Sequence, residues 1–178
     1  MCEKNITFIL LNYNSALMKE KEIKLVYTEY NDMAEMSDED RMLVGKAIEA
    51  GRKAYAPYSR FQVGAAMLLE DGTVVSGANV ENAAFPSGSC AEKTALSYAV
   101  SNYPGIKPVA IAVVARTEKG LTGEPVPPCG NCRQMLLEEE NRNNKPIRVI
   151  LYGAERIVVV PNSEKLMPLQ FTRDHLVG

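Results

Sequence analysis

The chain has 178 residues, a length that favours one domain with a substantial hydrophobic core. Its formal net charge is −2 and its pI is about 5.6, so no overall basic character marks it for nucleic acid or an anionic membrane surface. No apolar run approaches the roughly 20 residues of a bilayer span. We therefore expect neither nucleic acid nor a membrane as a partner.

Residues 1–36 carry little pattern, and we expect them to form an N-terminal extension. A domain at 37–172 and a tail at 173–178 would follow. The short apolar run in "NITFILLNY" lacks a small-residue cleavage site, so no secretory signal is expected. This predicts a cytoplasmic protein, in which structural disulfides are rare. "IKLVYTEY" alternates enough to be a strand, and Met18, a little before it, offers an alternative start.

A helix is predicted over residues 38–55. Ser37 suits an N-cap, because the acidic Asp40 follows it and apolar residues then recur at helical spacing. Pro57 disfavours helical geometry at the residue before it, so the helix should stop there.

The rest of the chain alternates strands and helices. The expected elements are a hairpin at 62–80 turning at Asp71-Gly72, a helix from Cys90, a doubly covered strand at 107–116, a helix at 130–142, and two strands around Gly153. "YGAE" is too short for a parallel crossover, so the last two strands should be antiparallel. The order predicts an α/β fold, a three-layer α/β/α sandwich with a five-stranded mixed sheet.

Three of the four cysteines lie in two short motifs. "CAEKTA" contains Cys90 and Glu92, and "PPCGNCRQ" contains Cys129 and Cys132 in a C-x-x-C spacing. Each motif begins an expected helix, where the unpaired N–H groups and the dipole favour a thiolate. Three ligands with one vacancy is the pattern of a catalytic zinc site. The remaining alternatives are a redox pair, a packing cysteine and a carboxylate that merely favours the dipole.

The motifs together resemble those of zinc-dependent nucleoside and nucleobase deaminases, with cysteine in place of the first histidine. "PYSRFQVGAA" and "GANVENAAFPSGSCAEKTA" extend the resemblance to the small, homotetrameric cytidine deaminases over residues 38–172. It implies that Cys90, Cys129 and Cys132 ligate Zn²⁺. Glu92 would carry protons from water to N3 of the base and to the leaving amine. The implied reaction converts cytidine and deoxycytidine to uridine and deoxyuridine, in pyrimidine salvage.

The resemblance also implies the substrate contacts. Phe61 would stack on the base, and the backbone N–H of Ala91 would contact its O2 atom. Asn79 and Glu81 would hydrogen-bond the ribose 3′-hydroxyl. Phe171 would enter the pocket of a neighbouring subunit, so that a homotetramer shares its active sites. From the residues alone, core packing would be the ordinary role of Phe61.

The sequence departs from the family pattern at three positions. Lys93 follows the catalytic glutamate where arginine is frequent, Phe85 replaces a common tyrosine, and Pro127 replaces serine or threonine. Three thiolates against Zn²⁺ leave an excess of negative charge. Lys93 and Arg133 are therefore the candidates to compensate it beside the sulfur atoms.

Three rival functions remain open. The first is a deaminase for a related small aminopyrimidine or an aminated nucleoside drug; an enzyme for free bases would have no use for a ribose-binding pair such as Asn79 and Glu81. A non-catalytic zinc module would need a fourth protein ligand, and only Cys2 and His175 remain as cysteine or histidine candidates. A polynucleotide editor fits poorly with the slightly negative net charge of the chain. It also fits poorly with antiparallel last strands, because the deaminases of polynucleotides and transfer RNA resemble one another in having parallel ones.

Overall fold

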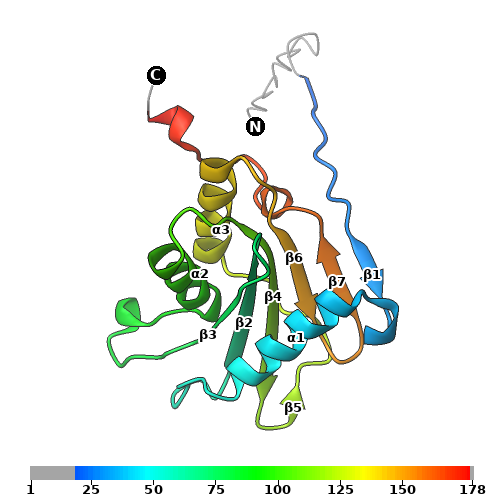
Figure 1. Ribbon diagram of the computed structural model, residues 1–178, viewed down its shortest axis with the longest axis vertical. Helices are drawn as coiled ribbons and strands as arrows, with labels where there is room; N and C mark the ends of the chain where they lie inside the picture. Colours follow the sequence, from blue (N-terminus) through cyan, green and yellow to red (C-terminus); the bar gives the residue numbers. More distant parts are fainter. Residues whose placement is uncertain (1–18, 177–178) are drawn as a thin grey trace, which may run out of the picture.

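The computed structural model describes residues 19–176, within which seven strands form one sheet (Figure 1). The strands are β1 Thr28–Tyr30, β2 Gln62–Leu69, β3 Val74–Ala78, β4 Pro108–Thr117, β5 Gly120–Leu121, β6 Arg148–Tyr152 and β7 Ile157–Val160. They lie in the order β1-β7-β6-β4-β2-β3, and β5 pairs with β4. Among these strands β4 and β6 run parallel, and the other pairs are antiparallel.

The sheet confirms the predicted mixture of directions but not the predicted strand number. Its last two strands are antiparallel, with Tyr152 opposite Ile157, and the hairpin of β2 and β3 turns as expected, with Gly72 at a φ of 88°. The predicted count of five strands is wrong, because β1 and β5 extend the sheet. β5 is a two-residue return after a turn, too short to show any periodicity.

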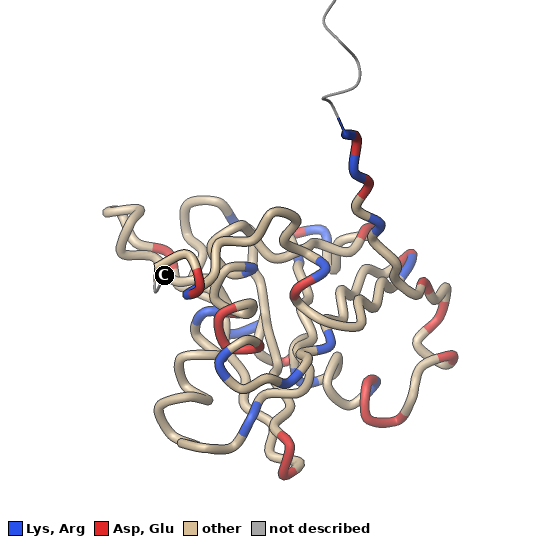
Figure 2. Tube along the Cα trace, turned by 90° about the horizontal axis from the view of Figure 1, so that it is seen from above, with Lys and Arg blue, Asp and Glu red and all other residues tan. Residues whose placement is uncertain are grey.

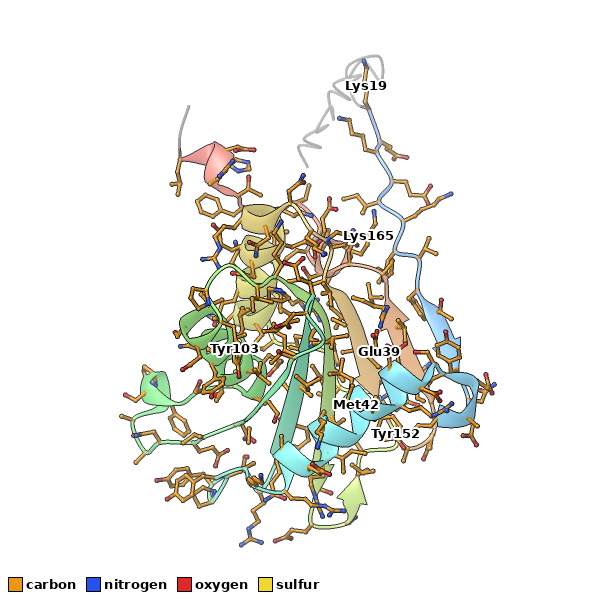
Figure 3. The ribbon with its side chains drawn as sticks, viewed as in Figure 1. Lys19, Glu39, Met42, Tyr103, Tyr152 and Lys165 are labelled. Carbon is orange, nitrogen blue, oxygen red and sulfur yellow. The ribbon has the colours of Figure 1, made fainter. Side chains whose placement is uncertain are left out.

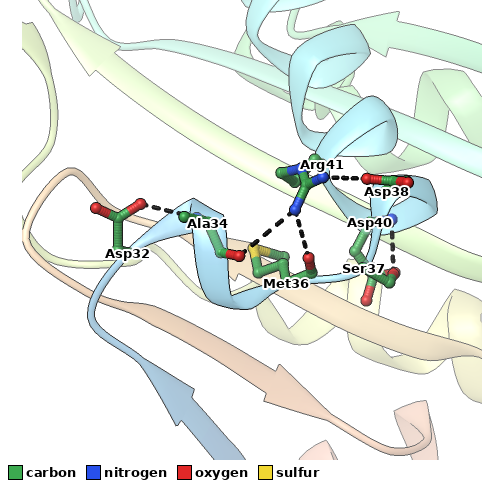
Figure 4. Close-up of polar contacts among 7 residues, drawn as sticks. All are labelled: Asp32, Ala34, Met36, Ser37, Asp38, Asp40 and Arg41. Atoms are coloured by element: carbon green, nitrogen blue, oxygen red, sulfur yellow. Dashed lines mark hydrogen bonds and ion pairs between the residues drawn. The ribbon is translucent and has the colours of Figure 1, made fainter.

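Helix α1, Asp38–Gly51, begins as predicted but ends early. The Ser37 hydroxyl accepts a hydrogen bond from the N–H of Asp40 at 3.1 Å (Figure 4). The predicted end at residue 55 is wrong, because Tyr55 is drawn into another pairing. Its N–H donates to the carbonyl of Asn79 at 3.0 Å, which takes the chain out of the helix.

Helices cover both faces of the sheet. α1 packs on one face, whereas α2, Ala91–Asn102, and α3, Gly130–Asn143, lie together on the other (Figure 1). β4 contributes to both cores, because Ile111 and Val113 face α2 and α3 while Ala112 and Val114 face α1. Four 3-10 helices occur among the described residues: η2 Met33–Glu35, η3 Phe85–Ser87, η4 Ser163–Leu166 and η5 Arg173–His175.

The first turn of α2 lies directly against β3. A Cβ atom on Gly77 would stand 2.5 Å from the nitrogen of Ala95 and 2.6 Å from the carbonyl oxygen of Ala91. Only glycine allows this approach. The glycine therefore helps to set the position of the helix start that carries Cys90.

Residues 28–36, which the sequence analysis assigned to an extension, belong to the packed body. Thr28–Tyr30 pairs with β7, and Met36 is buried in the core under α1. Arg41 of α1 donates to the carbonyl of Met36 at 2.7 Å (Figure 4). The predicted strand "IKLVYTEY" is paired only at its end, and the apolar run "TFILL" and Met18 lie outside the described residues. No helix within residues 19–176 is long and apolar enough to cross a bilayer.

Candidate active site

Two helix starts bring three cysteines together. Cys90 is the N-cap of α2, Cys129 is the N-cap of α3, and Cys132 lies in the first turn of α3. Their sulfur atoms all lie within 4.8 Å of one another. The Sγ atoms of Cys90 and Cys129 are 3.8 Å apart, far beyond the roughly 2.05 Å of a disulfide. The arrangement is a cluster of three free thiols.

This donor set fits Zn²⁺. Tetrahedral zinc with Zn–S bonds of about 2.3 Å holds two sulfurs roughly 3.8 Å apart, which matches Cys90 and Cys129. Burial raises the pKa of the Cys90 and Cys132 thiols, so a cation among them is needed to stabilise their thiolates. At Cys129, hydrogen bonds led by the backbone of Cys132 outweigh burial and lower the pKa. Within residues 19–176 the group contains three sulfurs and no fourth protein ligand.

Glu92 lies two residues after Cys90, on the first turn of α2. Its side chain is buried, with the residue 6% exposed, and burial raises the pKa of its carboxyl. A carboxyl with a raised pKa gives up and takes back a proton more readily near neutral pH than an exposed one. Its place beside the thiols suits proton transfer.

A cavity of about 370 Å³ collects most of the predicted site residues. It is lined by, among others, Phe61, Asn79, Glu81, Cys90, Ala91, Glu92 and Cys129. The volume is within the range of small-molecule sites. Val63, Val113 and Val126 also line it and were not singled out from the sequence, because the first two read as ordinary core positions of β2 and β4.

The side chains of Asn79 and Glu81 both hold the segment that carries Phe61. Asn79 accepts a hydrogen bond from the N–H of Val63 at 2.7 Å and donates to the carbonyl of Phe61 at 3.0 Å. Glu81 Oε2 accepts from the N–H groups of Tyr58 and Ser59, at 2.9 and 3.2 Å. Hydrogen bonds from Ser59 lower the pKa of Glu81, so the carboxylate is ionised at neutral pH. This bracing was not predicted from the sequence.

Phe171 does not line this cavity in its own chain. The residue is 55% exposed, and its ring stacks on His175 with 5.6 Å between ring centroids. Its carbonyl accepts a hydrogen bond from Gln134 Nε2 at 2.9 Å, which ties the C-terminal segment to α3.

The two candidate cations lie near the cluster without a hydrogen bond to its sulfurs within the described part of the chain. Lys93 is exposed on α2. Arg133 donates to the carbonyl of Pro128 at 2.8 Å and to that of Leu166 at 3.1 Å. Arg133 therefore braces the backbone just before Cys129 and links it to η4.

The fold and the cysteine cluster define a mixed α/β protein with a metal site at two helix starts, and comparison with known proteins gives its family. The sequence model of the "Cytidine and deoxycytidylate deaminase zinc-binding region" matches residues 9–123, which include Cys90 and Glu92. The chain belongs to the cytidine deaminase family.

Individual relatives agree with this assignment. The cytidine deaminase of Halalkalibacterium halodurans is 45% identical over 137 residues, covering 76% of this chain and 96% of the relative. That of Sporosarcina psychrophila is 41% identical, covering 75% and 92%. The crystal structure of cytidine deaminase from Burkholderia pseudomallei matches with a TM-score of 0.64 and 39% identity, covering 76% of this chain and 100% of that one. The Mycobacterium tuberculosis structure matches with a TM-score of 0.59 and 34% identity, covering 76% and 98%.

Proposed function

We propose that this protein is a zinc-dependent deaminase that hydrolyses cytidine and 2′-deoxycytidine to uridine and 2′-deoxyuridine, with release of ammonia. The observation that carries the proposal is a cluster of three cysteine sulfurs, of which Cys90 and Cys129 line one cavity together with the buried Glu92. Relatives named cytidine deaminases, covered over nearly their whole length, support the same substrate.

The reaction replaces the C4–N4 bond of the base with a C4–O bond, so one water is consumed and one ammonia is released. Cys90, Cys129 and Cys132 would hold the zinc, which when bound supplies Lewis-acid activation that brings the pKa of water toward about 7. Glu92 accepts the proton that the water gives up. It delivers this proton to ring N3, takes a second proton from the new hydroxyl at C4 and gives that one to the departing amine, and its raised pKa suits both directions of transfer.

The cavity supplies a binding contact for each part of the nucleoside. Phe61 offers a ring for stacking on the base, and the N–H of Ala91, at the start of α2, has no partner within its own helix and donates to O2. Glu81 binds the backbone through Oε2, which leaves Oε1 to accept from a ribose hydroxyl. The amide of Asn79 retains one N–H and one lone pair for the same hydroxyl.

We further propose that the protein acts as a homotetramer in the cytoplasm, in pyrimidine salvage. The exposed ring of Phe171, anchored to α3 through Gln134, is available to cover a nucleoside in a neighbouring subunit. We propose that Lys93 offsets part of the negative charge of the thiolates. We propose the same role for Arg133, which is held beside Cys129 by its hydrogen bond to the carbonyl of Pro128.

One experiment separates this function from its rivals. Purified protein is incubated with cytidine, deoxycytidine, cytosine or a cytosine-containing oligonucleotide, and ammonia and bound zinc are measured. We expect one zinc per chain and ammonia from the two nucleosides alone. Release from cytosine would favour a free-base deaminase and release from the oligonucleotide a polynucleotide editor. Zinc without ammonia would favour a non-catalytic module.

A further inference from the structure

The N-terminal arm, defined as residues 19–27, leaves the sheet where its pairing with β7 stops. Thr28 stands opposite Val159, so continuing the same register would place Val26 opposite Pro161. Proline has no N–H to donate and interrupts a ladder. The arm therefore continues past the end of β7 (Figure 1), beside the body but without a ladder partner among the described residues.

The arm exposes a row of large apolar side chains. Ile23 is 64% exposed, Leu25 49%, Val26 69% and Tyr27 48%. An extended segment with free N–H and C=O groups and an apolar face is a template for pairing with another strand. The arm therefore needs a partner, and its own sequence indicates which one.

We propose that the arm pairs antiparallel with the same arm of a second copy of this chain, about a two-fold axis at Leu25. In this register Ile23 stands opposite Tyr27 of the partner subunit, and Lys21 stands opposite Glu29 of the partner subunit. The two-fold axis repeats each pair, so a single register buries the apolar side chains and matches the charges twice.

Charge patterning distinguishes this register from its neighbours. Basic and acidic residues alternate along the arm (Figure 2), and Figure 3 shows Lys19 at its outer end. An axis at Lys24 would place two lysines directly opposite each other, which is unfavourable. An axis at Ile23 would place Lys21 opposite the apolar Leu25. The axis at Leu25 avoids the lysine pair. It places Lys24 opposite Val26, but it also sets Ile23 opposite Tyr27 and Lys21 opposite Glu29, whereas an axis at Ile23 places Lys19, Glu20 and Lys21 all opposite apolar or aromatic residues.

The groove beside the arm fits the same occupant. Ile23, Leu25 and Tyr27 point to one side and line a cavity of about 430 Å³ with Leu151 and Val158 of the sheet. Pairing two arms would place the corresponding side chains of the second copy on the same side, where they add apolar surface to this groove.

The arm pairing is independent of the proposed catalysis. The groove beside the arm and the cavity with Glu92 share Pro127 in their linings, but no residue of the arm lines the cavity with Glu92. Substitutions in the arm should therefore leave the release of ammonia from cytidine unchanged. Loss of activity with intact cross-linking, or the reverse, would show which of the two proposals fails.

Disulfide trapping tests the pairing with a matched control. Leu25→Cys and Val26→Cys are made in full-length, zinc-loaded protein carrying Cys2→Ser, and each is treated with oxidised glutathione at two concentrations tenfold apart. At the axis, residue 25 lies opposite its own copy. Two copies of residue 26 lie diagonally, with Cβ atoms roughly 7 Å apart, beyond the reach of a disulfide.

We expect a covalent dimer of the Leu25→Cys protein on a non-reducing gel, at least tenfold more abundant than that of the Val26→Cys protein, at both concentrations. Equal yields from the two variants would indicate random collision and overturn the proposal. A Leu25→Cys protein that stays monomeric on the gel would overturn it as well.

Discussion

The two ends of the proposed substrate cavity, which we call the metal end and the sugar end after the groups proposed to bind there, are built differently. The metal end consists of two helix starts, each contributing cysteines from the N-cap or first turn. The sugar end consists of a turn and a strand end that hold each other through Asn79 and Glu81. At the metal end, the proposed chemistry and local structure come from the same short motifs. At the sugar end, side chains proposed to bind ribose also support the fold, so binding and stability are linked there.

The largest effect is expected at the metal end. Cys129→Ser should lose zinc and with it essentially all activity, because hydroxyl oxygen is a much poorer zinc ligand than thiolate. Stability should fall as well, since zinc ties α2 to α3. A loss of about 2 kcal/mol would lower the melting temperature by roughly 4–8 °C in a domain of this size. Zinc analysis and thermal unfolding check the two effects. A variant that lacks zinc but is as stable as the wild type would show that the metal acts in catalysis and does not stabilise the fold.

Glu92→Gln should separate chemistry from metal binding. The change keeps the shape and removes the proton carrier, so we expect kcat for cytidine to fall on the order of 10²–10⁴-fold. Zinc content should equal that of the wild type. The Glu138→Gln variant, a similar change at a distant position of α3, serves as the control for loss of charge. Near-normal turnover by Glu92→Gln would contradict the role of Glu92.

The sugar end should show the link between binding and stability. Asn79→Ala leaves the N–H of Val63 and the carbonyl of Phe61 without their partner, so it should lower stability by about 1–3 kcal/mol and raise KM. Glu81→Gln keeps an acceptor for Tyr58 and Ser59 and should raise KM with little change in melting temperature. Equal melting temperatures for the two variants would contradict the expectation that Asn79→Ala lowers stability while Glu81→Gln does not.

A smaller effect is expected from Phe171→Ala. It should raise KM several-fold while zinc content stays unchanged, because a binding contact is lost and no ligand is removed. Mixing it with Glu92→Gln protein under conditions of verified subunit exchange should restore some activity, since one chain then supplies the ring and another the carboxylate. A mixture no more active than its parts would argue against shared sites.

The smallest effect is expected from deleting residues 1–17. The packed body begins at Thr28, so activity and melting temperature should stay within error of the full-length protein. A shift of more than roughly 4 °C would mean that this segment packs on the body or on a neighbouring subunit.

The difference between the two ends also explains what the sequence could predict. The helix starts at Cys90 and Cys129 were visible because capping, spacing and thiol chemistry are local properties. The bracing by Glu81 was not, because it joins residues more than 20 positions apart. The family resemblance named Phe61, Asn79 and Glu81 as substrate contacts. The structure adds the hydrogen bonds by which Asn79 holds the backbone of Phe61 and Glu81 holds the turn before it.

In the fold, the long elements with strong patterns were predicted, whereas the two-residue β5 and the end of α1 were not. β4 reads clearly as a strand because it is buried on both faces. β5 has two residues, and the end of α1 depends on the pairing of Tyr55 with a distant strand end. Long-range hydrogen bonds of this kind leave no periodic trace in a sequence.

X-ray absorption at the zinc K-edge tests the central claim most directly, because it reports the ligands of the metal itself. We expect zinc bound by three sulfurs at about 2.3 Å and one oxygen or nitrogen at roughly 2.0 Å in the purified, active protein. Cys129→Ser protein should show no such spectrum. Four sulfur ligands in the wild type would indicate a closed structural site and contradict the account.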